Sequence, residues 1–326
     1  MNSIKRPNYK PFVLMINDIS WLSPIKIFFI ILFLTVPISI WLKTPTASPI
    51  QLAYSISITI YIVKKHEYYL DLLKPVLTLD EDAFIIEKQT LSHFSKRFIF
   101  GGIILAPAFF LFVNWRSTQL QELFAGNITS YSFIWSLLMA ILSWIAILQS
   151  LTVVLSNIIQ FKRLGKNFTK INLLDTDTLN PYSMVGLSTT LIIIGSYTIV
   201  PIAYLDSVRL LRPALVSLVI TLPLVIYFLL APILALHNKI KIAKSIEFKI
   251  LTKAIKGDYN ELKHSHLNLS KLPKQIDLIL YRNFIEKVDE WPIDNRGSLR
   301  LALYFLIPIL AWVSSSLIDR IIDFAL

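Results

Sequence analysis

"KVDEWPIDNRGSLRLALYFLIPILAW" covers Lys287–Trp312 and changes from a charged segment to an apolar one within a few residues. Charged side chains flank Trp291-Pro292 on both sides, whereas 301–312 contains none. Because proline restricts the preceding residue to extended conformations, we expect a helix to end at Trp291. Tryptophan is also favoured at the membrane–water interface. We therefore predict a re-entry hinge at Trp291 and Pro292, followed by a membrane helix that Pro308 kinks. This hinge is either a fixed turn or a joint that moves during function.

The composition around this stretch is that of a membrane protein. Of the 326 residues, 55% are hydrophobic and 16% are charged, whereas about 25% are charged in soluble domains. The mean hydropathy is +0.61. The chain has no cysteine, which excludes disulfide scaffolds, thiolate metal sites and a cysteine nucleophile.

Seven runs without Asp, Glu, Lys, Arg or His approach the length of about 20 residues that spans a bilayer. They are Ile27–Leu42, Ser48–Val63, Phe98–Trp115, Ser132–Phe161, Ser183–Leu205, Pro213–Leu236 and Leu301–Ile318. The second run alternates polar and apolar residues, as a strand does. The fourth is long enough that it must tilt strongly or project from the bilayer.

The distribution of basic residues predicts the orientation. With the N-terminus inside and seven spans, the inside segments hold 27 of the 32 Lys and Arg residues and the outside segments hold 5. Cytoplasmic segments carry such an excess. We therefore expect a bacterial inner-membrane protein with a cytoplasmic N-terminus and a periplasmic C-terminus. The net charge of +11 is explained by orientation and by contact with anionic lipid at the cytoplasmic face. No motif indicates nucleic-acid binding.

The predicted fold is an all-α polytopic transmembrane helix bundle of about seven spans with a small cytoplasmic helical layer. Residues 1–26 form a cytoplasmic or interfacial segment. Spans one to six occupy 27–236, with cytoplasmic loops 64–97 and 162–182. Residues 237–300 form a cytoplasmic helical hairpin against the bilayer face. Residues 301–326 form the last span and a short periplasmic tail.

The cytoplasmic segments show helical signals. Thr78–Glu81 has the S/T-x-x-E form of a capping box and predicts a helix start. In 238–256 and 272–291, apolar residues recur every four positions, which predicts two helices with apolar faces. These positions are Ile242, Ile246, Ile250 and Ala254 in the first segment and Ile276, Leu280, Phe284 and Val288 in the second.

Two groups of residues are candidates for chemistry at the cytoplasmic face. "DYNELKHSH" places His264 and His266 after Glu261, a donor set that suits a metal, although a solvated loop is the simpler interpretation. His66, beside Lys64-Lys65 and Tyr68-Tyr69, is interpreted as part of an interfacial belt. No phosphate-binding glycine loop or other cofactor motif occurs, so no cofactor is predicted.

The span interiors carry small and polar residues but no ionisable group, which disfavours proton-coupled transport and voltage sensing. The candidate polar or packing surface consists of Gln149, Gly186, Ser188, Thr189, Thr190, Gly195 and Ser196. Such a surface suits either close helix contact or a substrate path. If one face meets a second protomer, the protein is a homo-oligomer.

Asp175 through Gly186-Leu187, and Glu290-Trp291-Pro292 with Pro308 and Trp312 beyond it, resemble uncharacterised multi-pass inner-membrane proteins of Gram-negative bacteria. The resemblance covers the C-terminal half and implies localisation only. The favoured function is a non-enzymatic membrane component: a channel-like or sensory subunit, or one that binds a cytoplasmic protein. The alternative is a solute transporter without embedded charge. A membrane enzyme with its active site at the cytoplasmic face is a third.

Overall fold

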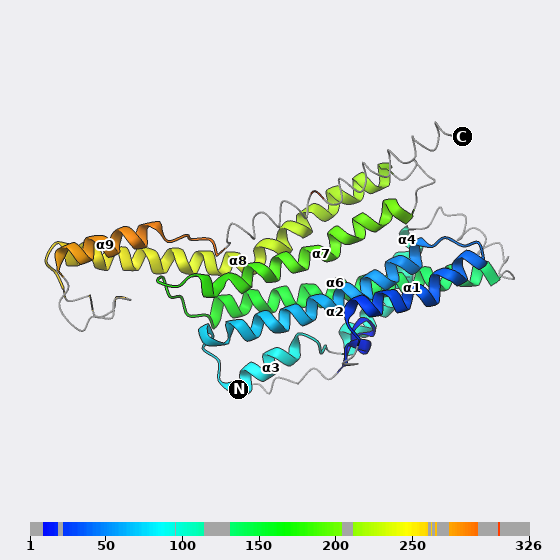
Figure 1. Cartoon of the computed structure of the whole chain (residues 1–326), viewed down its shortest axis with the longest axis horizontal. Helices are drawn as coiled ribbons and strands as arrows, with labels where there is room; N and C mark the ends of the chain where they lie inside the picture. The colour runs from blue at the N-terminus through cyan, green and yellow to red at the C-terminus, as the bar shows by residue number, and fades with distance from the viewer. Residues whose placement is uncertain are drawn as a thin grey trace.

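The computed structural model describes residues 9–18, 22–94, 96–113, 131–203, 211–259, 262, 265, 274–292 and 306. Within these residues the chain consists of helices joined by turns and loops, with two isolated β-bridges that join Tyr9 to Phe94 and Leu77 to Thr169. The long helices lie side by side along one axis (Figure 1). The elements are η1 (Phe12–Asp18), α1 (Pro24–Trp41), α2 (Ala47–Leu73), η2 (Lys74–Val76), α3 (Glu81–Thr90), α4 (Lys96–Val113), α6 (Tyr131–Asn167), η3 (Asp177–Leu179), α7 (Asn180–Ala203), α8 (Leu211–Ile255) and α9 (Gln275–Lys287).

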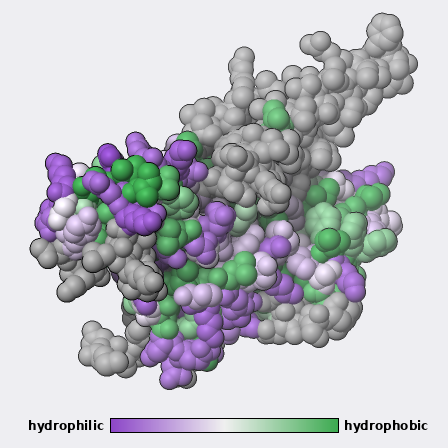
Figure 2. All heavy atoms as spheres, turned by 60° about the vertical axis from the view of Figure 1, so that its left-hand side comes forward, coloured by the Kyte–Doolittle hydropathy of each residue, from purple (hydrophilic) through white to green (hydrophobic). Residues whose placement is uncertain are grey.

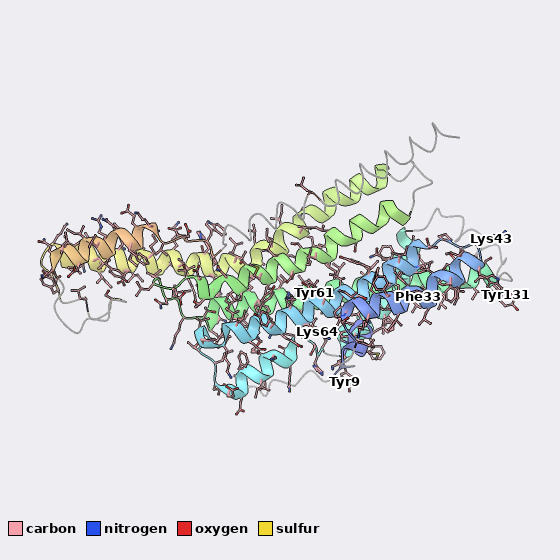
Figure 3. The ribbon with its side chains drawn as sticks, viewed as in Figure 1. Tyr9, Phe33, Lys43, Tyr61, Lys64 and Tyr131 are labelled. Atoms are coloured by element: carbon pink, nitrogen blue, oxygen red, sulfur yellow. The ribbon has the colours of Figure 1, made fainter. Side chains whose placement is uncertain are left out.

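The all-helical prediction is confirmed, and the helices are compatible with a membrane protein. Among the described residues, three stretches are long and apolar enough to cross a bilayer, namely Pro24–Trp41, Tyr131–Asn167 and Pro223–Ile255. Large apolar side chains on α1 are exposed, including Phe33 at 79% and Trp41 at 80%. Figure 3 shows Phe33 on α1, with Lys43 and Tyr131 at one end of the bundle.

The run 48–63 lies within α2 and is helical, so its alternating pattern does not produce a strand. Its polar groups form hydrogen bonds within α2 and with side chains of α6. Thr59 Oγ1 donates to the Ser55 carbonyl at 2.6 Å and lies 2.6 Å from Ser150 Oγ on α6. Ser143 Oγ of α6 donates to the Ser48 carbonyl at 2.6 Å. Polar residues therefore bind α2 to α6 in the bundle interior.

The fourth uncharged run belongs to α6, which has 37 residues and at 1.5 Å per residue is about 55 Å long. That length exceeds the bilayer core of about 30 Å, so α6 must project from it unless strongly tilted.

Helix α3 packs beside the polar ends of α2 and α6. Ion pairs join Arg163 to Glu87 at 2.6 Å and Lys88 to Asp71 at 2.7 Å.

The start of α3 differs from the predicted capping box. Asp80 is the N-cap and accepts a hydrogen bond from the Ala83 amide at 3.0 Å. Thr78 instead donates through Oγ1 to the Phe168 carbonyl at 2.9 Å. The Thr78 hydroxyl, which the sequence pattern predicts as the cap, therefore binds the segment after α6 instead of the start of α3.

Helix α8 continues beyond its apolar part, and α9 folds back along it. Gln275 Nε2 donates to the Ile255 carbonyl at 3.1 Å, and Lys244 Nζ donates to the Val288 carbonyl at 2.8 Å. We call the described residues of this antiparallel pair, 237–259 and 274–292, the arm. It extends the axis of α8 away from the rest of the bundle (Figure 1).

The predicted apolar faces of the arm are divided between its interior and its surface. Ile250 and Ala254 are buried, as expected for a packed face, whereas Ile242 and Ile246 are exposed. On α9, the buried residues are Leu278 and Ile285, while Ile276, Leu280 and Phe284 are all exposed. The regular four-residue spacing on α9 thus marks its outer face rather than its packed face.

Candidate functional site

His66 lies at the centre of a buried polar cluster, where α2, α6 and α7 meet. The residue follows Thr59 by seven positions, which places both on one side of α2. Its side chain is 0% exposed. The interfacial-belt interpretation is therefore wrong for His66, although Tyr68 two residues later is 54% exposed.

Both ring nitrogens of His66 have uncharged partners. Nδ1 lies 3.3 Å from Asn157 Nδ2 of α6, and Nε2 lies 3.3 Å from Ser188 Oγ and from Thr189 Oγ1 of α7. The two hydroxyls donate to the Val185 carbonyl at 3.0 and 2.8 Å. Their oxygens are therefore left to accept a hydrogen bond from Nε2–H, while Nδ1 accepts a hydrogen bond from the Asn157 amide N–H. This network assigns His66 as neutral, with the proton on Nε2.

We call His66, Asn157, Ser188 and Thr189 the polar node. The Phe161 ring closes it with its centroid 5.6 Å from that of His66, in an edge contact. Asn157 Oδ1 is buried without a hydrogen bond in the described part of the chain. A buried acceptor of this kind costs free energy unless it is used, so the node offers an uncharged acceptor beside a neutral imidazole.

The remaining predicted residues of α7 contact α2, α8 or their own helix. Ser196 Oγ accepts from Gln51 Nε2 of α2 at 3.1 Å, and Thr190 Oγ1 donates to the Leu187 carbonyl at 2.8 Å. A Cβ placed on Gly186 would lie 2.6 Å from the Leu229 carbonyl oxygen of α8. A Cβ on Gly195 would overlap the Tyr54 hydroxyl, which itself donates to the Leu191 carbonyl at 2.6 Å. The two glycines thus permit close packing within the chain.

Gln149 is placed apart from the α7 residues. It is buried on α6, and its Oε1 accepts from the Val13 amide of η1 at 3.4 Å. Its Nε2 makes no hydrogen bond with the described residues. The predicted surface therefore does not form a single site. Two of its seven members reach the polar node, Thr190 bonds within its own helix, and the other four lie at contacts between elements.

The return of the arm toward the bundle is held by His237. Its ring stacks on Trp291 with centroids 4.1 Å apart and planes 16° apart, and its Nδ1 lies 3.1 Å from the Glu290 carbonyl oxygen. Pro292 is buried. Of the predicted hinge residues, Trp291 therefore lies against α8, whereas Pro308 falls outside the described residues.

The interior of the arm contains a buried carboxylate. Glu247 of α8 is 1% exposed and accepts a short hydrogen bond from Ser265 Oγ. Burial, together with the nearby Glu247 carboxylate, raises the pKa of Tyr281. The Arg282 guanidinium lies over the Phe248 ring at 4.5 Å. These contacts join α9 to α8.

The metal candidates His264, His266 and Glu261 fall outside the described residues. Among the residues that are described, no group of three or more His, Cys, Asp or Glu is placed to hold a metal ion. The metal hypothesis thus stays a sequence-based prediction.

Replacing Trp291 by alanine is expected to loosen the return of the arm. A stacked ring pair contributes about 0.5–1.5 kcal/mol beyond its buried area, so amide hydrogen exchange in α9 should rise about threefold to tenfold. The measurement is exchange mass spectrometry on 275–287. Trp41→Ala is the control, because Trp41 is 80% exposed. Unchanged exchange in α9 of the Trp291 variant would show that the stack does not hold the arm.

The chain matches no protein-family model, and it shows no significant similarity to a curated protein or to a solved structure. Its function is therefore argued from its own residues.

Proposed function

We propose that the chain is a multi-pass bacterial inner-membrane protein of seven spans that acts as a non-enzymatic, partner-binding subunit. The observation that carries this proposal is α8, which runs unbroken from an uncharged stretch into the basic arm. The arm then presents apolar side chains beyond the apolar part of the bundle. A helix pair of this kind suits the binding of a cytoplasmic protein.

The helix directions support the proposed topology. In Figure 1, α2, α6 and α8 run one way along the bundle, and α1 and α7 run the other way. This is the order that spans one, two, four, five and six require with a cytoplasmic N-terminus. Lys43 and Tyr131 lie at the end assigned to the periplasm, and Lys64 lies away from it (Figure 3). Basic side chains near the cytoplasmic face would contact anionic lipid.

The dimensions of α8 support an arm that leaves the bilayer. The uncharged run ends at Leu236, and the 19 residues from His237 to Ile255 continue the same helix. At 1.5 Å per residue they extend about 28 Å farther. Six lysines occupy 239–256, and the one acidic residue there, Glu247, is buried. We propose that this segment extends into water, because it continues the axis of α8, instead of lying against the bilayer face as expected from the sequence.

Transport is the second candidate, and the polar node favours it. Asn157 Oδ1, which has no hydrogen bond among the described residues, offers an acceptor to an uncharged solute between α2, α6 and α7. If the node binds a solute, Asn157→Leu should abolish uptake while the protein stays folded.

A homo-oligomer would form through surfaces other than Gly186 and Gly195, because these two glycines contact other helices of the same chain. The exposed apolar face of α1 is the surface that could contact a second copy.

The topology is tested with single cysteines, because the chain has none of its own. Ser245, on the arm, and Lys43, between α1 and α2, are each replaced by cysteine in separate proteins. A membrane-impermeant maleimide should label Ser245→Cys from the cytoplasmic side and Lys43→Cys from the periplasmic side. Labelling of both from one side would contradict the seven-span arrangement.

A spin label at the same Ser245→Cys site tests whether the arm stands clear of the bilayer. A water-soluble paramagnetic reagent should broaden its spectrum more than dissolved oxygen does. The control is Phe33→Cys on α1, whose side chain is highly exposed in the apolar part of the bundle. There, oxygen should be the stronger reagent. Equal behaviour at the two sites would place the arm at the bilayer and remove the basis for a cytoplasmic binding surface.

A further inference from the structure

One outer face of α2 carries a lysine between two tyrosines. Tyr61, Lys65 and Tyr68 are separated by four and three positions, so they lie on one side of the helix. Lys65 Nζ lies 5.8 Å from the centroid of each tyrosine ring, within the range of a cation–π contact. The two tyrosines are 37% and 54% exposed, and Lys65 is partly exposed. We call these three residues the Lys65 face.

The polar groups of the Lys65 face have no partner in the described part of the chain. Lys65 Nζ makes neither an ion pair nor a hydrogen bond there, and the two tyrosine hydroxyls make no hydrogen bond there. Glu67 and Asp71 are two and six positions from Lys65 and therefore point to other sides of α2. Asp71 pairs with Lys88 at 2.7 Å. The face thus offers one positive charge and two hydroxyl donors.

The Lys65 face lies at the level where α2 would leave the hydrocarbon core. Between Ala47 and Lys65 the helix advances about 27 Å, close to the core thickness of about 30 Å. The uncharged run ends at Val63. Figure 3 shows Tyr61 well away from the end of the bundle that carries Lys43. Figure 2 shows hydrophilic side chains gathered low in the view, over α3, which packs beside the polar end of α2.

We infer that the Lys65 face binds the headgroup of one anionic phospholipid. The ammonium group pairs with the phosphate, and the two tyrosine hydroxyls donate to phosphate oxygens. Tyrosine suits this level of the bilayer, because its ring is apolar while its hydroxyl reaches the headgroups. The inference rests on the membrane insertion in the proposed function and specifies one of its lipid contacts.

Position and charge select a lipid over a second copy and over a free anion. On the side assigned to the cytoplasm, other uncharged runs are bordered by Lys96-Arg97, Lys162-Arg163 and Arg300. A second copy would therefore present basic side chains at this level, and like charges across an interface disfavour association. A free phosphate has no acyl chains to hold it beside the apolar part of the bundle. A phospholipid supplies the phosphate at the required depth.

The experiment uses the full chain in detergent and a phosphatidylglycerol with a diazirine in its acyl chain, next to the ester. After illumination, the adduct on 61–72 is measured against lipid concentration, which gives a Kd for this face. Lys65→Gln should raise the Kd about fivefold, because a near-surface lysine contributes about 1 kcal/mol toward anionic lipid. Tyr61→Leu with Tyr68→Leu should raise it about threefold, because the ammonium group is no longer held between two rings. An unchanged Kd in Lys65→Gln would overturn the inference.

Lys74→Gln is the matched control. Lys74 Nζ also lies over an aromatic ring, that of Phe84 at 5.2 Å, but it already pairs with Glu81 at 2.8 Å. This variant should keep the Kd of the parent protein. An equal loss in Lys65→Gln and Lys74→Gln would show a diffuse effect of surface charge and would overturn the inference.

A competition arm separates a lipid from a free anion. Glycerol phosphate at millimolar concentration should leave the adduct on 61–72 unchanged, because it lacks acyl chains. Loss of the adduct would identify a site for soluble phosphate instead of a lipid site. The same reagent with a phosphatidylcholine headgroup should bind more weakly, because its choline group carries a positive charge. Equal binding of both headgroups would contradict selection of an anionic lipid.

Two readouts separate the possible failures. All substituted side chains are at least partly exposed, so helix content and thermal unfolding in detergent should match the parent protein. If the lipid Kd is unchanged in Lys65→Gln while Ser245→Cys and Lys43→Cys are labelled from opposite sides, the lipid inference fails and the proposed topology stands. If the lipid Kd changes as expected but both cysteines are labelled from one side, the topology fails and the lipid site stands.

Discussion

Gly186→Leu should abolish the folded state or lower its stability by about 3 kcal/mol or more, the upper end of what overpacking costs. A Cβ at this position would lie 2.6 Å from the Leu229 carbonyl oxygen and 3.2 Å from two further main-chain atoms of α8. Main-chain atoms within a helix do not yield as a flexible side chain does. The helices α7 and α8 would therefore have to separate. The measurement is thermal unfolding in detergent, together with the yield of monodisperse protein.

Gly101→Leu is the matched control for this substitution. Gly101 is also helical, on α4, but a Cβ there would have no atom within 4 Å. Leucine favours a helix more than glycine by about 0.5–1 kcal/mol, so this variant should be neutral or slightly stabilised. A Gly186→Leu protein as stable as Gly101→Leu would show that α7 and α8 do not approach as closely as the structure places them.

His66→Lys should destabilise the protein by about 3–5 kcal/mol, the cost of an uncompensated buried charge. The polar node supplies an amide and two hydroxyls to the ring, with no carboxylate among these contacts. An ammonium group would lose its hydration without gaining a counter-ion, or else it would have to lose its proton. The readout is the free energy of unfolding or the midpoint of thermal inactivation in detergent.

Two variants separate charge from shape at this position. His66→Gln keeps an acceptor and a donor for Asn157 and the hydroxyls, so its loss should be about 1 kcal/mol. His93→Lys repeats the same substitution at a partly exposed histidine and should change stability by less than about 0.5 kcal/mol. If His66→Lys were as stable as His93→Lys, the imidazole would have to lie in water rather than between the three helices.

The candidate sites were predicted from the sequence only in part. Ser188 and Thr189 were identified as members of a polar surface, because they interrupt an apolar run. The sequence around His66, with Lys64-Lys65 before it and Tyr68-Tyr69 after it, indicates an interfacial position instead of a buried one. The seven-residue spacing between Thr59 and His66 indicates that both side chains lie on one face of α2. The sequence does not show that this face is buried, because its partners come from α6 and α7.

The arm shows the same division. The sequence predicted two helices at 238–256 and 272–291, and α8 and α9 cover most of both segments. Periodicity alone does not distinguish a packed apolar face from an exposed one. Ile276, Leu280 and Phe284 have the spacing of a packed face, yet Leu278 and Ile285 occupy the contact with α8.

Helical class and an apolar character suited to a membrane follow from the sequence itself, because both depend on sums over local residues: hydropathy over about 20 positions and helix propensity over each turn. The expected orientation has the same origin, as a count of Lys and Arg residues between runs. Contacts between distant segments do not sum in this way. The burial of His66, the approach of Gly186 to Leu229 and the outward face of α9 depend on how each helix is rotated about its axis. That rotation is set by the simultaneous packing of several helices, which only the tertiary structure determines.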